Sequence, residues 1–294
     1  MSPPTTGTWP GRQPGRLIDG RAVAARITEE TASEVVALRD RGVVPTLAIV
    51  VPNDDPGTAW YVRSLRRQAD RTGVEVDVHQ ELSATATVAT LARLSADPAV
   101  HGIICQTPLP AGLTTIEVGA TIALAKDVDG ANPASLGGVA AGEPGAFAPA
   151  TAAAVMEILA SEGIDLAGRP AVVVGRSTVV GRPAALLLIA ASATVTVAHS
   201  RTRDLAAVCR EAEILVVAAG RPQLIGAGHV APGAVVIDVG TNPAADGGLT
   251  GDVDTAAVQA IAAAVTPVPG GVGPVTTAQL LRQTVWAAEV ALFG

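Results

Sequence analysis

Short apolar runs alternate along this chain with longer stretches that have the apolar spacing of helices. In the first half, runs at 46–51 and 100–106 are apolar throughout, and a run at 74–79 alternates apolar and polar residues. The second half resumes the rhythm with Val-, Ile- and Ala-rich runs at 171–175, 194–198, 214–218, 235–239 and 264–267. Runs without alternation predict strands buried on both faces, so the chain is predicted to be an α/β protein with mainly parallel sheets covered by helices.

The stretches between these runs are predicted to be helices. The first is expected to begin at a capping Asp19, to reach about Arg41 and to end at Gly42. The others are expected at 58–71, around 88–94, at 152–161 and, closing the chain, at 277–292. Residues 126–149 are rich in Gly and Pro with little periodicity, so they predict an active-site loop at a domain junction.

Composition excludes several classes of function. The chain has 294 residues, which suggests two domains, and a net charge of −7, which argues against nucleic acid as a partner. Its two cysteines lack metal-ligand spacing and cannot form a disulfide framework, so we expect a reducing cytoplasm and no metal site. The longest weakly polar run, 184–198, is too short to span a bilayer, and residues 1–16 predict a disordered tail without a signal peptide.

The segment 171–183 has the composition of a strand, a glycine-containing loop and the start of a helix. Gly175 permits a tight turn, Gly181 permits a close approach of the helix, and Pro183 suits a first helical turn. Backbone N–H groups at such a helix start can bind the pyrophosphate of a dinucleotide. The spacing differs from G-x-G-x-x-G, so an ordinary strand-to-helix turn is the alternative.

The end of the next strand distinguishes between the two nicotinamide dinucleotides. An acidic residue there would bind the ribose 2′-hydroxyl of NAD, but this chain has Ser200 and Arg201, with Arg176 as a second cation. Arginine can donate two hydrogen bonds to a phosphate. This combination favours NADP, although Arg201 taken alone could equally be a solvated loop residue.

Six longer motifs together resemble the methylenetetrahydrofolate dehydrogenase/methenyltetrahydrofolate cyclohydrolase family. They occur in the family order from about Leu17 to the C-terminus. The motifs are QTPLP at 106–110, KDVDG at 126–130, GRSTVVGRP at 175–183, TVAHSRT at 196–202, VIDVGTN at 236–242 and TPVPGGVGP at 266–274.

The resemblance implies an N-terminal folate-side α/β domain (17–149 with 277–294) and a Rossmann-like NADP-binding domain with a parallel sheet (150–276). It also implies a folate cleft between the two domains and a homodimer formed through the dinucleotide domain. Asp129 would accept hydrogen bonds from the pterin, Tyr61 would stack on the substrate, and Gln106 would lie beside the reacting carbon. Gly273 and Pro274 would belong to a loop that closes on the substrate. The implied cofactor-binding residues are Gly175, Arg176, Ser177, Gly181, Ser200, Arg201 and Thr241.

One departure from the family bears on activity. In bifunctional members a lysine four residues after the tyrosine assists hydrolysis of the methenyl group, and this chain has Leu65 there. The only lysine, Lys126, belongs to another motif, and arginines are poor bases. Leu65 is equally explained as an apolar helix residue, yet leucine cannot exchange a proton.

Hydride transfer requires less of the side chains, because the cofactor supplies the difficult chemistry. We therefore expect NADP-dependent oxidation of 5,10-methylenetetrahydrofolate with weak or absent cyclohydrolase activity. A family member repurposed for another substrate, or a binding protein for folate or NADP without catalysis, is the alternative. Further departures on the folate side motivate it: Gly57, Thr58, Ala131, Asn132, Ser135, Ala148 and Ala152.

Overall fold

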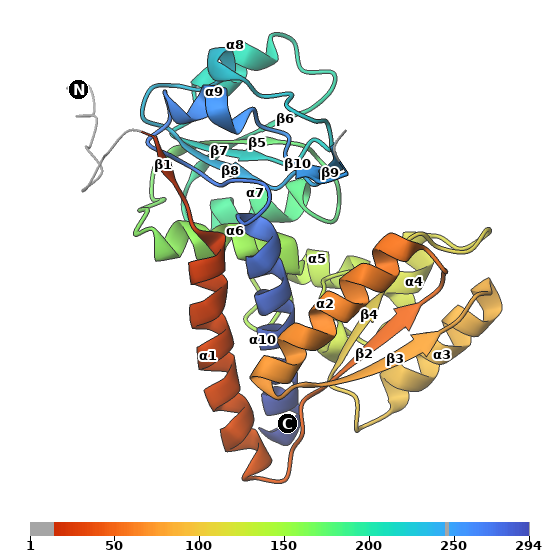
Figure 1. Cartoon of the computed structure of the whole chain (residues 1–294). Coiled ribbons are helices and arrows are strands. Elements are labelled where there is room, and N and C mark those ends of the chain that lie inside the picture. Colours follow the sequence, from red (N-terminus) through yellow and green to blue (C-terminus); the bar gives the residue numbers. More distant parts are fainter. Residues whose placement is uncertain (1–14, 245–246, 294) are drawn as a thin grey trace. The chain divides into compact units, whose positions relative to one another are not determined.

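The structure is a computed structural model that describes residues 15–244 and 247–293. These residues form two compact units, which we describe separately. The first contains the chain up to Gly20 together with Val155–Gly273, and the second contains Arg21–Ala154 and the chain from Pro274 onward. Both units are α/β with parallel sheets, as predicted (Figure 1). Within the described part of the chain, no helix is long and apolar enough to cross a membrane.

The second unit is built on a three-stranded parallel sheet with the order β3-β2-β4. β2 (Thr46–Val51) lies in the centre, between β3 (Glu75–Gln80) and β4 (Gly102–Cys105). The central strand is almost entirely buried, whereas β3 alternates exposed and half-buried residues, as its sequence predicts.

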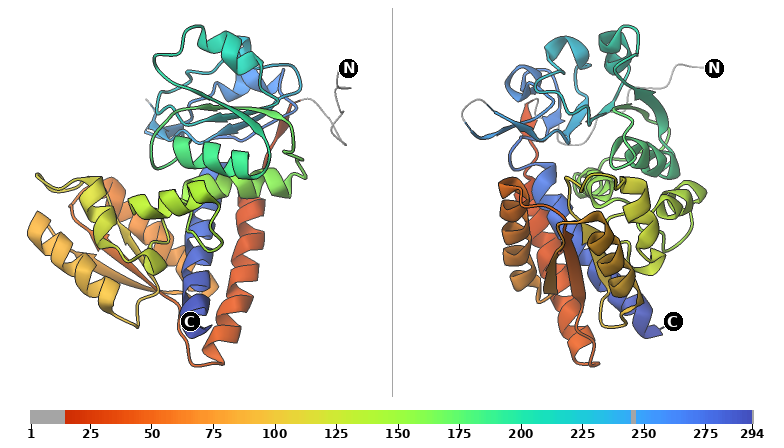
Figure 2. Two further views of the ribbon diagram at one scale, coloured as in Figure 1. Left: turned by 180° about the vertical axis from the view of Figure 1, so that it is seen from behind. Right: turned by 90° about the vertical axis from the view of Figure 1, so that its right-hand side faces the viewer.

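Helices cover both faces of this sheet (Figures 1 and 2). Leu47 and Ile49 of β2 share one apolar cluster with side chains of α1 (Gly20–Arg39), α2 (Pro56–Thr72) and α10 (Val272–Phe293). Ala48 and Val50 face the other way, into a cluster with α3 (Ala84–Ala96) and α4 (Thr115–Thr121). The period of two along β2 thus places its two helical layers.

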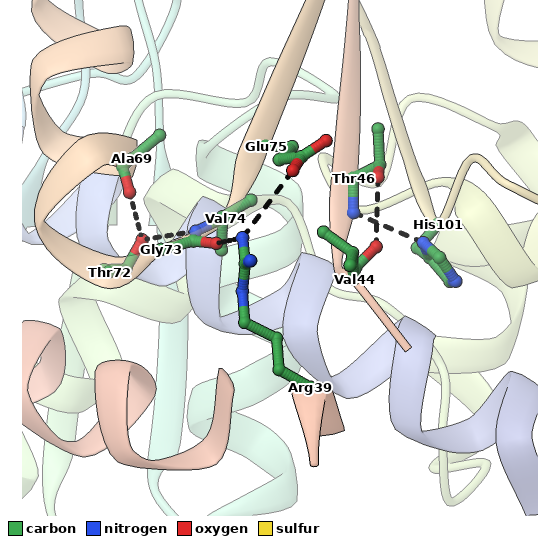
Figure 3. Close-up of polar contacts among 9 residues, drawn as sticks. All are labelled: Arg39, Val44, Thr46, Ala69, Thr72, Gly73, Val74, Glu75 and His101. Atoms are coloured by element: carbon green, nitrogen blue, oxygen red, sulfur yellow. Dashed lines mark hydrogen bonds and ion pairs between the residues drawn. The ribbon is translucent and has the colours of Figure 1, made fainter. Parts of the chain in front are cut away.

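Local sequence signals set both ends of α2. Asp55 accepts a hydrogen bond from the N–H of Thr58 (2.9 Å) and Pro56 occupies the first turn, where its missing N–H has no cost. At the other end Gly73 has φ +78° and donates to the carbonyl of Ala69 (2.8 Å). Figure 3 shows that Arg39 of α1 donates to the carbonyl of Gly73 (2.9 Å), which fixes this helix end against α1.

His101 has a structural role at the start of β2. Its Nδ1 accepts a hydrogen bond from the backbone N–H of Thr46 over 3.2 Å (Figure 3). Burial is the main cause that lowers the pKa of His101, and the charge of Lys126 adds to it. The neutral ring that accepts from Thr46 is therefore the favoured form.

The first unit contains a parallel sheet of six strands with the order β1-β11-β8-β7-β5-β6. In chain order these strands are β1 (Arg16–Leu17), β5 (Pro170–Val174), β6 (Thr194–Ala198), β7 (Ile214–Val217), β8 (Val235–Asp238) and β11 (Ala264–Val265). Its helices are α6 (Ala150–Ser161, from Val155 onward), α7 (Gly181–Ala190), α8 (Leu205–Arg210) and α9 (Thr255–Gln259). Figure 1 shows α8 and α9 on one side of the sheet and α7 on the other. A short antiparallel pair, β9 (Asn242–Pro243) and β10 (Leu249–Thr250), follows β8.

The prediction that β6 is buried on both faces was wrong. Its residues match the range 194–198, but β6 is the edge strand, and of its five residues only Ala198 is buried. Apolar content alone does not tell a central strand from an edge strand.

The loop expected over 126–149 was also wrong in part. A short 3-10 helix (Leu124–Lys126) ends at residue 126, where the expected loop begins. The helix α5 (Pro133–Ala141) lies within the range of that loop. Asn132 caps α5 by accepting from the N–H of Ala134 (2.9 Å), Pro133 follows, and Gly142 closes it at φ +70°. These terminal signals were present in the sequence, but nine residues rich in Ala and Gly show no clear apolar stripe.

Other elements were not predicted, namely α4, α8, α9 and the β9–β10 pair. The tail predicted over residues 1–16 lies outside the described residues up to position 14. Arg16 instead pairs with Ala264 as the first residue of β1.

Candidate active site

Two aspartates of the KDVDG motif have different surroundings. Asp127 is fully buried and accepts hydrogen bonds from the N–H groups of Ala131 and Asn132 (2.8 Å each) and from the hydroxyl of Ser135. It therefore fixes the turn that leads into α5. Asp129 is only partly buried and accepts from the backbone N–H of Ala150. Asp129 thus has acceptor capacity left for a ligand, whereas that of Asp127 is largely used within the turn.

The pKa of the Asp129 carboxyl group lies near neutral pH. Burial, reinforced by the negative charge of Asp127, raises the pKa of Asp129 to about 7, against the lowering effect of Ala150. A ligand that donates hydrogen bonds to this carboxylate would favour its ionised form. A ligand with adjacent N–H donors would therefore stabilise the carboxylate form of Asp129 and bind to it.

Tyr61 of α2 lies beside this carboxyl group. Burial raises the pKa of the Tyr61 phenol, and the charge of Asp129 raises it further, so the phenol stays neutral. The ring packs against the apolar cluster of the unit and remains partly exposed. A ring with one face in the core and part of its surface exposed can serve as a stacking platform.

Gln106 follows β4 directly and is half-buried. Its N–H donates to the carbonyl of Val50 (2.9 Å), which continues the parallel pairing past the end of β4. Two further bonds join the segment after Gln106 to the start of α2. The hydroxyl of Thr58 donates to the carbonyl of Thr107 (3.0 Å), and Asn53 donates to the carbonyl of Pro108 (2.9 Å). These bonds connect the segments that carry Gln106 and Tyr61.

Leu65 is a core residue. Its exposed fraction is 0%, and it belongs to the apolar cluster of the unit together with Val62 and Ala69. The Lys126 ammonium donates to the carbonyls of Leu94 and Asp97 at the end of α3 (3.3 and 2.5 Å). The only lysine of the chain is thereby engaged away from α2, and residue 65 carries no ionisable group.

Gly273 and Pro274 were expected in a loop, and this was wrong. Both lie in the first turn of α10, which begins at Val272, five residues earlier than predicted. Gly273 is exposed, and a Cβ atom built there would meet nothing within 4 Å.

In the first unit, the loop after β5 has the close packing that its glycines suggested. A Cβ atom on Gly175 (φ +131°) would lie 2.1 Å from the carbonyl oxygen of Ala218, and one on Gly181 would lie 2.4 Å from that of Gly175. The Ser177 hydroxyl accepts from the N–H groups of Val180 and Gly181 (3.1 and 3.4 Å) at the start of α7. Residues 176–179 of this loop are exposed.

The turn after β6 presents polar side chains at the same edge of the sheet. The His199 N–H donates to the hydroxyl of Thr202 (2.8 Å), and His199 Nδ1 accepts from the N–H of Arg201 (3.1 Å). His199 thus closes the turn, while Ser200 and Arg201 are exposed. Among the residues that the structure describes, the guanidinium groups of Arg201 and Arg176 have no anionic partner, which suits a phosphate group.

Thr241 is exposed after β8, at the same carboxyl edge. Two buried carboxylates beneath this edge, Asp238 and Asp252, were not predicted as functional residues. Their partners come from several loops, so only the fold reveals them.

A parallel sheet with glycine-rich turns, exposed arginines and a hydroxyl-lined carboxyl edge defines a dinucleotide-binding α/β protein. The second unit carries a carboxylate with acceptor capacity, Asp129, beside Tyr61. Comparison with known proteins gives the family. The model of the tetrahydrofolate dehydrogenase/cyclohydrolase catalytic domain matches residues 18–129, and that of the NAD(P)-binding domain matches 149–292. The chain belongs to the tetrahydrofolate dehydrogenase/cyclohydrolase family.

Individual relatives agree with this assignment. The bifunctional protein FolD of Parafrankia sp. is 60% identical over 275 residues, covering 93% of this chain and 99% of that protein. The crystal structure of FolD from Campylobacter jejuni has a TM-score of 0.91 at 38% identity and covers 93% of this chain and 98% of its own. FolD from Trypanosoma brucei, solved with NADP cofactor and inhibitor, has a TM-score of 0.91 at 36% identity, covering 96% and 100%.

Proposed function

We propose that this protein oxidises 5,10-methylenetetrahydrofolate to 5,10-methenyltetrahydrofolate with NADP, and that its cyclohydrolase activity is weak or lost. The observation that carries the first part is the contrast between Asp127, whose oxygens are engaged within the fold, and Asp129, which has acceptor capacity beside Tyr61. Family membership supports the reaction class.

Each residue of the folate site has a proposed role. Asp129 accepts from the ring N–H and the exocyclic amino group of the pterin, and Tyr61 stacks on the substrate rings. Gln106 lies next to the carbon that loses hydride, and Gly273 and Pro274 contact the substrate from the start of α10. Positioning of this kind is the main contribution that a protein makes to hydride transfer.

The proposed cofactor is NADP. When bound, it would accept a hydride, which is the hydrogen together with the electron pair of the C–H bond that breaks in the methylene group. The product is then the methenyl cation of the folate, together with NADPH. Ser200, Arg201 and Arg176 bind the 2′-phosphate. Gly175, Ser177, Gly181 and Thr241 line the rest of the dinucleotide site. The Trypanosoma brucei structure, described with NADP, supports this choice.

The second part of the proposal rests on Leu65. Residue 65 is a buried leucine, and the one lysine of the chain is engaged at α3. Relatives of this chain are named bifunctional proteins, so the proposed loss is argued from the residues of this chain alone. Hydrolysis needs a group that moves a proton during attack of water, and no group at position 65 can do so.

The test is one reaction followed at two wavelengths. Purified protein is mixed with 5,10-methylenetetrahydrofolate and NADP, with NAD in a parallel arm, and NADPH and the methenyl product are measured together. We expect NADPH to form faster than NADH, with matching accumulation of methenyl product. Methenyl product that disappears faster than in buffer would contradict the loss of hydrolysis.

The same assay addresses the alternative that departures on the folate side mark a changed substrate. Two of these departures have structural roles here, since Asn132 caps α5 and Ser135 bonds Asp127. This weakens the alternative. If NADP binds but no NADPH forms, the alternative of a repurposed enzyme or a binding protein would replace the proposal.

We also propose that the protein is a homodimer through its dinucleotide unit. The edge strand β6 supports this proposal, because its outer backbone groups are unpaired within the sheet and Val197 is 42% exposed. Light scattering should give twice the mass of the chain, and Val197→Glu should shift it to a monomer. A monomeric wild-type protein at micromolar concentration would contradict the proposal.

A further inference from the structure

Two fully buried carboxylates lie beneath the carboxyl edge of the six-stranded sheet. Asp238 is the last residue of β8, and Asp252 follows β10. Burying a charge is costly unless hydrogen bonds satisfy it. The partners of these two groups therefore indicate what they hold in place.

Asp252 accepts hydrogen bonds from the loop that follows β7. Its Oδ2 accepts from the N–H groups of Ala219 and Gly220 (2.6 and 2.8 Å), and its Oδ1 accepts from the N–H of Arg221 (2.8 Å). A fourth bond comes from the side-chain amide of Asn242 (2.9 Å). Three successive backbone donors thus converge on one carboxylate, and both of its oxygens are engaged within the protein.

Asp238 in turn fixes the backbone that carries Asp252. Asp238 Oδ1 accepts from the N–H of Asp252 (3.0 Å) and of Gly240 (2.9 Å), and Oδ2 accepts from that of Val253 (3.0 Å). The backbone of Gly240 is packed closely against this side chain, since a Cβ atom on Gly240 would lie 2.3 Å from Asp252 Cγ. The pair is therefore a rigid support.

This support continues to the glycine loop after β5. Ala218 precedes the three residues that Asp252 holds, and its N–H donates to the carbonyl of Val174 (2.7 Å). Its own carbonyl oxygen lies where a Cβ atom on Gly175 would be 2.1 Å away. A shift of the loop 219–221 would therefore be transmitted to Gly175.

We propose that Asp252 is a positioning residue for the dinucleotide, which it serves by holding the loop 219–221 against the glycine loop at the carboxyl edge of the sheet. This inference rests on the proposed use of NADP. Ligands of open parallel sheets bind at this edge, so the backbone of 219–221 and Gly175 forms part of the surface that a dinucleotide must meet. Asp252 itself is buried and does not touch the cofactor.

The variant Asp252→Asn tests the role with little change in shape. If its amide nitrogen faces Ala219 and Gly220, two donors oppose donors. If it faces Arg221 and Asn242, the same conflict arises on the other side. Either orientation leaves buried N–H groups without an acceptor and displaces the loop. Asp254→Asn is the matched control, because Asp254 accepts from the N–H of Ala257 (3.1 Å) in α9, whereas the donors of the loop 219–221 bond to Asp252.

Binding of NADP is measured directly by titration calorimetry, alongside the KM for each substrate, kcat and the melting temperature. We expect Asp252→Asn to raise the Kd and the KM for NADP at least 10-fold, with the KM for methylenetetrahydrofolate changed less than 2-fold. Asp254→Asn should leave the Kd for NADP unchanged and the melting temperature close to that of the wild type, because Asn caps a helix about as well as Asp. A lower melting temperature with an unchanged Kd in Asp252→Asn would reduce Asp252 to a stabilising residue and overturn the proposal.

A second variant covers the case in which Asp252→Asn fails to fold. Asn242→Ala removes only one donor from Asp252 and should raise the Kd for NADP about 2- to 4-fold, and an unchanged Kd would count against the proposal. Wild-type protein is titrated first, without folate. Failure of the wild type to bind NADP would contradict the proposed function itself, which separates that outcome from an error about Asp252.

Discussion

Lys126 donates a hydrogen bond from its ammonium group to the backbone carbonyl of Asp97 over 2.5 Å. The same group donates to Leu94, so the only lysine of the chain satisfies carbonyls at the end of α3. Each of these carbonyls also accepts one backbone N–H, from Asp97 to Leu94 (3.2 Å) and from Val100 to Asp97 (3.1 Å), and the cation adds a favourable interaction with the negative end of the helix dipole. We expect Lys126→Met to lower the free energy of unfolding by about 1 kcal/mol, measured by urea denaturation. Dehydrogenase and hydrolysis rates should stay within a factor of two, and a larger loss of hydrolysis would show that Lys126 takes part in it.

Restoring a lysine on α2 should restore hydrolysis. Residue 65 lies one turn beyond Tyr61, and residues four apart share a helix face. We expect Leu65→Lys to raise the rate of methenyltetrahydrofolate hydrolysis at least 10-fold above the wild type. Because the side chain is fully buried, the amine should cost about 2–4 kcal/mol of stability. Hydrolysis is measured by loss of methenyl absorbance against a buffer blank.

Leu65→Met is the matched control, because it keeps the volume and adds no ionisable group. It should leave the stability within about 1.5 kcal/mol of the wild type and bring no gain in hydrolysis. Equal hydrolysis rates for the wild type and Leu65→Lys above the buffer blank would show that another group already performs the step, and equal rates at the level of the blank would contradict the role assigned to a lysine at position 65.

The raised pKa of Asp129 predicts a dependence of stability on pH. The folded-state value of about 7 lies above the value of 3.8 for a free aspartate, so the carboxyl group stabilises the fold below about pH 4. That contribution is lost as pH rises through 7. We therefore expect Asp129→Asn, measured without ligand, to gain roughly 1–3 kcal/mol relative to the wild type between about pH 4 and pH 8. Urea denaturation at several pH values checks this, and a pH-independent difference would contradict the raised pKa.

The same variant should lose at least 10-fold in folate affinity.

Arg201 should decide between the two dinucleotides. Loss of a charged hydrogen-bonding partner of a phosphate costs about 1.5–3 kcal/mol, which corresponds to roughly 10- to 100-fold in binding. We expect Arg201→Ala to raise the KM for NADP by that factor and to leave the KM for NAD unchanged. Arg93→Ala, which removes an exposed arginine of α3 in the other unit, is the charge-matched control. Equal effects of Arg201→Ala on both cofactors would place Arg201 away from the 2′-phosphate.

Strands and long helices could be predicted because each carries its own pattern. The run 46–51 coincides with β2, and 194–198 coincides with β6. The exposure of β6 could not be predicted, because its position at the edge depends on strand order rather than on its residues. Short α5 was missed for a different reason, since its capping residues give a clear signal but its interior gives none.

Some residues of the candidate site could likewise be predicted from the sequence, and others could not. Asp129, Gln106 and the glycines at 175 and 181 could be named because they belong to contiguous motifs. The support formed by Asp238 and Asp252 could not, because Asp252 meets residues 31–33 positions earlier in the chain. Contacts of that kind depend on how the strands are ordered in the sheet, which no local pattern reports.

Gly175 offers the sharpest test of the close packing at the dinucleotide edge. An added Cβ atom would lie 2.1 Å from the carbonyl oxygen of Ala218, a backbone atom that cannot move aside easily, and φ +131° disfavours any other residue. We expect Gly175→Ala to lower the free energy of unfolding by about 2–4 kcal/mol and to weaken NADP binding more than 10-fold. Gly137→Ala is the control, because Gly137 is an exposed interior residue of α5 with nothing within 4 Å of its added Cβ atom. That change should stabilise the protein by up to about 1 kcal/mol through helix propensity. If the two variants behaved alike in urea denaturation and NADP titration, the glycine at 175 would be dispensable and the packing of its loop against Ala218 would not shape the cofactor site.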